Sequence, residues 1–147
     1  MGYRNVVVGT DGSETAELAV RHAGRLAASA GARLVVVTAF EPHNDQVAKE
    51  SKAPDDLRWM LTDRSMAEEK ARKGRALARE EGATDVVVQA VEGNPAETVI
   101  DAARDFDAEL IVVGSKGLTS AARFILGSVA DDVSHHAPCD VLVVHTQ

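Results

Sequence analysis

The sequence predicts one α/β domain, Rossmann-like, with a single doubly wound, five-stranded parallel sheet in the order 3-2-1-4-5 and helices on both faces. Short apolar runs rich in Val, Leu and Ile alternate with longer helical stretches, without the two-residue alternation of a half-exposed strand. Such runs indicate a sheet that is covered on both faces. A hydrophobic content of 45% with only 3% aromatic residues, over 147 residues, fits one domain spanning 1–147.

Five apolar runs are the predicted strands, at residues 5–9, 34–40, 85–91, 110–114 and 140–145. In the expected order, strands 1 and 4 lie side by side at the point where the winding of the sheet reverses. Ligands of such sheets bind in the crevice at the carboxyl ends of these two strands. The residues that follow 9 and 114 are therefore expected to form one site.

Four helices are predicted, at residues 14–30, at 56–81, from 94 onward and at 128–136. Gly82 is a suitable C-terminal stop for the second helix. Asn94 suits the N-cap of the third helix and Pro95 its first turn. The fourth helix ends before Pro138, since the residue before a proline disfavours helical geometry. The polar, aperiodic segment 41–55 is predicted to be a loop beside the site.

Charge and composition exclude several classes of protein. A net charge of −7 argues against nucleic-acid binding, which needs dense cationic contacts to phosphate. No run approaches the roughly 18 uninterrupted apolar residues of a membrane span, so no membrane partner is expected. The amino terminus enters a predicted strand without the charged and then apolar segment of a secretion signal. The single cysteine, Cys139, fits a reducing compartment. We expect a cytoplasmic protein.

A glycine motif follows the fourth strand: Gly114-Ser115-Lys116-Gly117, nine residues, then Gly127-Ser128. Glycines at a strand exit and a helix entrance let backbone N–H groups approach a phosphate. The motif therefore predicts an anion cradle and a nucleotide ligand. The segment Thr10-Asp11-Gly12-Ser13 after the first strand is expected to converge on it. Neither the P-loop pattern nor the G-x-G-x-x-G dinucleotide fingerprint is present.

Each of these residues also has a purely structural interpretation. Gly114 and Gly117 would then form a tight turn, and Ser128 with Asp131 would form a capping box. Asp11 would cap the helix that begins near Ser13.

The chain resembles the universal stress proteins, in their ATP-binding subclass. The family motif G-x2-G-x9-G-[ST] is matched by Gly114, Gly117, Gly127 and Ser128. The opening segment 6–13, the Gly93-Asn94-Pro95 turn and the segments 126–129 and 136–139 extend the resemblance over essentially the whole chain.

The resemblance implies roles for residues at the ends of the first two strands and of the fourth. Backbone groups of Thr10 and Ala39 would meet the adenine, and Gly114 would let the ribose lie against the chain. Asp11 would lie beside the ribose and phosphates, or would help to hold a nucleotide-bound Mg²⁺.

The resemblance also implies which groups bind the phosphates. They are the N–H groups of Gly117, Gly127, Ser128 and Val129 and the hydroxyl of Ser128. Lys116 and Arg123 are the nearest candidate cations, with a solvated surface charge as the alternative for Lys116. Ala130 departs from the polar residue common in related chains, which puts one phosphate or metal contact in doubt.

The function expected from these features is adenine-nucleotide binding by a small stress-response or signalling module, with ATP as ligand and at most slow hydrolysis. No catalytic residue is expected. Preference for cAMP or AMP over ATP is an alternative, and a true ATPase or nucleotidyl-transfer enzyme on the same scaffold is another. The resemblance further implies a homodimer that pairs through the last strand, near residues 141–145.

Overall fold

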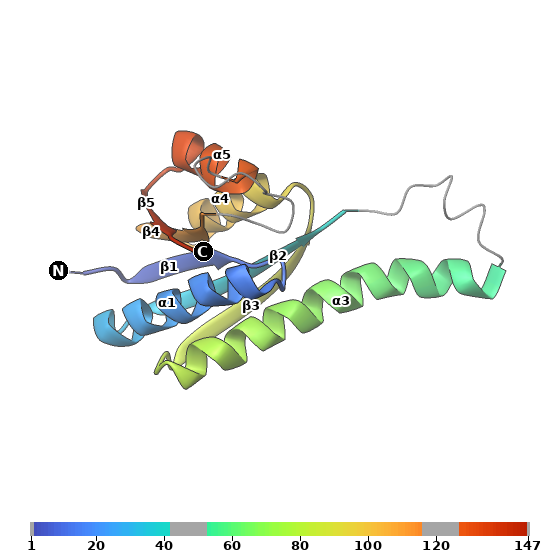
Figure 1. The fold of residues 1–147 in the computed structure, drawn as a ribbon, viewed down its shortest axis with the longest axis horizontal. Coiled ribbons are helices and arrows are strands. Elements are labelled where there is room, and N and C mark those ends of the chain that lie inside the picture. The colour runs from blue at the N-terminus through green and yellow to red at the C-terminus, as the bar shows by residue number, and fades with distance from the viewer. Residues whose placement is uncertain (1, 42–52, 116–126, 147) are drawn as a thin grey trace.

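The computed structural model describes residues 2–41, 53–115 and 127–146 and shows an α/β fold (Figure 1). The elements, in chain order, are β1 (Asn5–Gly9), α1 (Glu14–Ala30), β2 (Arg33–Phe40), α3 (Ala53–Glu80), β3 (Asp85–Glu92), α4 (Pro95–Asp105), β4 (Leu110–Gly114), α5 (Ser128–His136) and β5 (Asp140–Val144).

The strands form one parallel sheet in the order β3-β2-β1-β4-β5, which confirms the predicted topology. The central strand β1 pairs with β2 through Val8 and Val36 and with β4 through Val8 and Val112. The carboxyl ends of β1 and β4 therefore lie side by side. We call the edge of the sheet at which its strands end the carboxyl edge.

Two apolar layers flank the sheet, because alternate strand residues point to opposite faces. Val6, Val8 and Val36 belong to the layer beneath α1 and α3, whereas Val7 and Ile111 belong to the layer beneath α4 and α5. Figure 1 shows the two helix pairs on opposite sides of the strands. Buried strand residues such as Val7 and Val35 are completely inaccessible to solvent, as the apolar runs predicted.

The second helix differs most from its prediction. It begins at Ala53, so residues 53–55 belong to α3 and not to the expected loop, whose remaining residues 42–52 lie outside the described part of the chain. A proline in the first turn is compatible with a helix because its missing N–H would have no partner there. Pro54 therefore does not mark the end of the preceding loop. No helix in the described residues is long and apolar enough to cross a membrane.

Helices α1 and α3 approach each other closely at Gly24. A Cβ atom built on Gly24 would lie 2.8 Å from the Cα atom of Ala78 and 2.9 Å from its carbonyl oxygen. Real Cβ atoms do not come this near to backbone. The contact therefore depends on glycine at position 24, and it holds α3 against α1, while α3 packs on β2 and β3 of the sheet.

Candidate functional site

A tight turn connects β1 to α1 at the carboxyl edge. The Thr10 N–H donates to the Val37 carbonyl oxygen at 2.9 Å, which holds the end of β1 against β2. The chain then reverses at Gly12, whose φ of +81° favours glycine. The Gly12 N–H donates to the Thr10 Oγ1 atom at 3.1 Å. This turn places Asp11 at the carboxyl edge, just after the end of β1.

Asp11 supports the start of α1, but it is not the helix cap. Ser13 is the N-cap, and its hydroxyl oxygen accepts from the Ala16 N–H at 3.2 Å. One carboxylate oxygen of Asp11, Oδ1, accepts both the N–H and the hydroxyl of Ser13. The other oxygen, Oδ2, has no hydrogen-bond partner among the described residues. Half of the Asp11 carboxylate is thus engaged in the turn, and half remains available at the carboxyl edge.

The amino terminus of α5 faces the same edge and has no side-chain cap. Gly127 is the N-cap residue, so the interpretation of Ser128 as the cap of a capping box was wrong. The first helical bond runs from the Asp131 N–H to the Gly127 carbonyl oxygen. The N–H groups of Ser128, Val129 and Ala130 therefore have no acceptor within the described residues.

The other two helices whose entrances are described have caps. Ser13 caps α1, and the Asn94 side chain accepts from the N–H groups of Ala96 and Glu97 at the start of α4, as predicted. The amino terminus of a helix carries a partial positive charge, and its free N–H groups bind anions. The uncapped start of α5 is therefore chemically suited to an anion in a way that the starts of α1 and α4 are not.

Ser115 holds the start of α5 at the end of β4. Its carbonyl oxygen accepts from the Gly127 N–H at 2.7 Å, and its hydroxyl oxygen accepts from the Thr146 N–H at 3.1 Å. The prediction that the Gly127 N–H binds phosphate is corrected, because this N–H is already committed to Ser115. Sequence reasoning missed the positioning role of Ser115, although the residue lies inside the glycine motif.

The end of β2 supplies a buried hydroxyl that sequence reasoning also missed. Thr38 is only 1% exposed, and its Oγ1 atom has no hydrogen-bond partner in the described structure. Buried polar atoms are nearly always hydrogen-bonded, so this one is exceptional. Ala39, the predicted adenine contact, follows Thr38 in β2 and is half-buried beside Val91 of β3.

Comparison with known proteins decides the family. The model of the universal stress protein family matches residues 2–145. The chain belongs to the universal stress protein family. The universal stress protein Rv1636 of Mycobacterium tuberculosis is 35% identical over 144 residues, covering 98% of this chain and 97% of that protein.

Two solved universal stress proteins resemble the chain over nearly its whole length. One, in complex with cAMP, has a TM-score of 0.76 and 34% identity and covers 100% of both chains. Another, from Archaeoglobus fulgidus in complex with dAMP, has a TM-score of 0.68 and 27% identity, with 97% of this chain and 98% of that chain covered.

Several predicted site residues of this universal stress protein lie outside its described part, namely Lys116, Gly117 and Arg123. Their roles stay predictions. Within the described ranges, no group of three or more His, Cys, Asp or Glu side chains is arranged to hold a metal ion. The role of Asp11 toward a nucleotide-bound Mg²⁺ is a separate prediction, because such an ion would be held mainly by phosphates.

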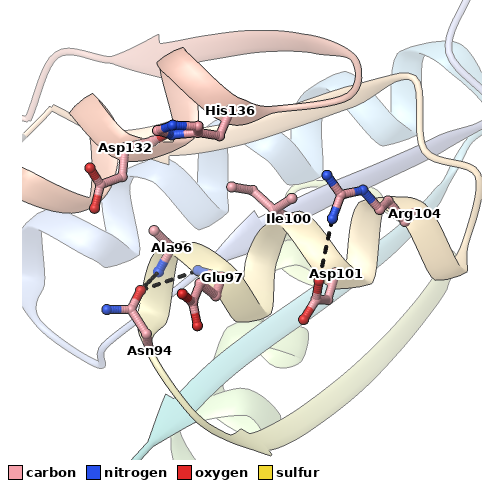
Figure 2. A pocket seen from close by; sticks show the side chains of 8 residues that line it. All are labelled: Asn94, Ala96, Glu97, Ile100, Asp101, Arg104, Asp132 and His136. Carbon is pink, nitrogen blue, oxygen red and sulfur yellow. Dashed lines mark hydrogen bonds and ion pairs between the residues drawn. The ribbon is translucent and has the colours of Figure 1, made fainter.

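A hollow of about 480 Å³ lies between α4 and α5 of this universal stress protein (Figure 2). Its lining includes Glu97, Ile100 and Arg104 of α4 and Asp132 and His136 of α5. None of the predicted nucleotide-binding residues lines it. Its place between α4 and α5, and a lining that includes the acidic residues Glu97, Asp101 and Asp132, distinguish it from the predicted anion site at the carboxyl edge.

Because the buried Thr38 hydroxyl has no hydrogen-bond partner among the described residues, its removal is expected to change the stability of the protein. Replacing Thr38 by valine is expected to raise the free energy of unfolding of the nucleotide-free protein by about 1 kcal/mol, because a buried hydroxyl without a partner costs free energy. Urea denaturation measures this change. Thr98→Val is the matched control: the buried Thr98 hydroxyl donates to the Pro95 carbonyl oxygen at 3.0 Å, so its removal should destabilise. Equal destabilisation by both variants would show that Thr38 has a partner in solution.

Proposed function

We propose that this universal stress protein binds an adenine nucleotide at the carboxyl edge, between the β1–α1 turn and the amino terminus of α5. ATP is the ligand we propose first, and cAMP or AMP is the alternative. The observation that carries the proposal is the set of three N–H groups at residues 128–130 that have no acceptor in the described structure. The relatives solved with cAMP and with dAMP support an adenine nucleotide as the occupant.

The available donors are strong enough for useful affinity. Hydrogen bonds to a charged group contribute about 1.5–3 kcal/mol each. Three N–H groups and the Ser128 hydroxyl would together approach the roughly −8 kcal/mol of a micromolar complex. The partial charge at the start of α5 adds to this attraction.

The remaining contacts follow from the elements that end at the carboxyl edge. The free Oδ2 atom of Asp11 would accept from a ribose hydroxyl or coordinate a nucleotide-bound Mg²⁺. Since the Thr10 N–H is used by Val37, Thr10 would contribute its other backbone atoms to the adenine pocket, together with Ala39. Gly114, at the end of β4, would let the ribose lie against the chain.

Mass spectrometry of the purified protein under native and denaturing conditions tests the ligand directly. Calorimetric titration with ATP, AMP and cAMP, each with and without Mg²⁺, then ranks the candidates. We expect micromolar affinity for at least one of them. No heat and no protection against thermal unfolding with any of the three would overturn the proposal.

The rival function is that of a true ATPase or nucleotidyl-transfer enzyme. We propose instead a cytoplasmic stress-response or signalling module with at most slow hydrolysis, whose nucleotide state changes its partners or stability. Steady-state turnover of Mg-ATP distinguishes the two functions. Many turnovers per minute would favour the enzyme.

We also propose a homodimer formed by pairing of β5 with its symmetry mate. The strand pairs with β4 on one side, and its four apolar residues are only partly buried in the single chain. An unpaired apolar edge favours aggregation unless another strand covers it. Pairing in the dimer would remove this hazard.

Val143→Lys is expected to shift the protein toward monomer, because a lysine at the edge opposes strand pairing. Sedimentation velocity over a range of protein concentrations measures the shift. Leu18→Lys is the control, since Leu18 is 47% exposed and lies on helix α1, outside the strands of the sheet. A wild-type protein that stays monomeric at every concentration would contradict the dimer.

A further inference from the structure

The side chain of Lys70, on α3, crosses the β1–α1 turn at the candidate site. The Cγ and Cδ atoms of Lys70 lie 2.9 Å from the position that a Cβ atom on Gly12 would take. Gly12 follows Asp11 directly, so the lysine stem rests on the turn that presents the Asp11 carboxylate. The absence of a side chain at Gly12 makes room for this stem.

Lys70 has no acidic partner among the described residues, unlike Lys73, which lies three residues further along the same helix. Lys73 forms an ion pair with Glu17 of α1, with Nζ and Oε2 2.8 Å apart. For Lys70, no ion pair or hydrogen bond joins its ammonium group to any described residue. Its side chain is nevertheless only partly exposed, whereas that of Lys73 is 64% exposed. A half-buried cation without a counter-charge is available for an anionic ligand.

The register of α3 on the sheet places Lys70 at the carboxyl edge. A Cβ atom on Gly74 would lie 2.9 Å from a Val36 methyl group, and the Arg64 guanidinium lies 5.0 Å from the Phe40 ring centre. These contacts show that α3 runs antiparallel to β2. Lys70 lies four residues before Gly74 on the helix, and Thr38 lies two residues after Val36 on the strand. Both separations span about 6 Å, so the helical turn that carries Lys70 lies level with Thr38. The Thr38 hydroxyl, which has no partner among the described residues, thus lies level with the helical turn from which the Lys70 side chain starts.

The negative charge of the chain gives a reason for a cation at the position of Lys70. The chain has a net charge of −7, and Asp11 adds a carboxylate at the site itself. A polyphosphate therefore approaches against a repulsive field unless a cation lies close by. Neutral N–H groups of α5 face the carboxyl edge from one side of the sheet, and Lys70 on α3 lies on the other side.

We infer that Lys70 is a ligand-binding cation, which contacts a phosphate of the bound nucleotide from the α3 side of the carboxyl edge. The inference rests on the proposed function, and it adds a cation from α3 to Lys116 and Arg123, the candidate cations in and beside the glycine motif. The nucleotide would be bound from two sides. Uncharged backbone amides at the start of α5 would contact it on one side, and the Lys70 ammonium group near Gly12 would contact it on the other. Electrostatic attraction by Lys70 would make the affinity depend on salt concentration.

Calorimetric titration of ATP into Lys70→Gln, Lys70→Met and Lys73→Gln tests this inference. Lys70→Met keeps an apolar stem over Gly12, so it separates loss of charge from loss of packing. We expect both Lys70 variants to bind ATP about tenfold more weakly than wild type, as loss of one charge-assisted contact predicts. Lys73→Gln should bind as wild type does, and Lys70→Arg should retain most of the affinity.

Repeating the titrations at several salt concentrations gives a readout that packing alone would not change. The affinity of wild type should fall more steeply with salt than that of either neutral Lys70 variant. If wild type binds ATP and the neutral Lys70 variants match it in affinity and salt dependence, the assignment of Lys70 is wrong and the proposed function stands. If wild type binds no nucleotide at all, the proposed function fails, and the assignment of Lys70 fails with it.

Discussion

Replacing Ser128 by proline is expected to weaken nucleotide binding about 30-fold or more while the fold is retained. The substitution removes one N–H group and one hydroxyl from the start of α5, and each bond to a phosphate contributes about 1.5–3 kcal/mol. Proline is favoured at the first position of a helix. The preceding residue, Gly127, has φ −60° and ψ 155°, which is the extended conformation that proline requires of its predecessor. Isothermal titration calorimetry measures the loss of affinity.

Ser128→Ala is the matched control for this experiment, since it removes the hydroxyl but leaves the N–H group in place. The difference between the two variants isolates the contribution of the backbone donor. Circular dichroism and thermal unfolding check that both variants are folded. Should Ser128→Pro bind nucleotide as tightly as Ser128→Ala, the amide at residue 128 is not a ligand-binding group, and the proposed cradle is refuted.

Replacing Gly24 by valine is expected to lower the free energy of unfolding by about 3 kcal/mol, at the upper end of typical overpacking effects. The first atom of the new side chain would already lie 2.8 Å from the Ala78 Cα atom. Backbone cannot rotate away as a side chain can, so α1 and α3 would have to separate. Because α3 carries Lys70 and covers Thr38, nucleotide affinity should also fall. Chemical denaturation monitored by circular dichroism measures the stability.

The same valine at Ser29, an exposed position on α1, serves as the control for Gly24→Val. It tests the helix propensity of valine without the contact to α3, and it should change stability by less than about 1 kcal/mol. A Gly24→Val protein as stable as Ser29→Val would show that the two helices are not held together as closely as the structure has them.

The strands and their order could be predicted because apolar runs report burial on both faces and because parallel crossovers follow one hand. The start of α4 could be predicted in the same way, because Asn94 caps the helix with its side chain and Pro95 suits its first turn. The start of α3 was predicted three residues late, since Pro54 is compatible with both a loop and a first helical turn. Local signals at a helix end do not distinguish between these two alternatives.

The glycine motif indicated the start of α5 but not how its donors are used. The local sequence predicts Ser128 as the N-cap residue, whereas the structure shows that Gly127 is the N-cap. The structure also shows that the Gly127 N–H donates to the Ser115 carbonyl oxygen. The choice depends on how the end of β4 meets the helix. That contact joins Ser115 to Gly127, which are far apart in the local sequence pattern.

The sequence by itself determined the five-stranded parallel sheet and the meeting of β1 and β4 at one edge, because both depend on local patterns or on general rules of chain connection. It also predicted a glycine-rich anion motif beside that edge, whose role stays a prediction. Tertiary structure alone decided that Lys70 crosses Gly12, that the Thr38 hydroxyl lacks a partner among the described residues, and that Gly24 lets α3 approach α1 closely. The first and third of these features depend on the register of α3 against α1 and the β1–α1 turn. That register follows from close packing of side chains far apart in the sequence, which no short stretch of residues encodes.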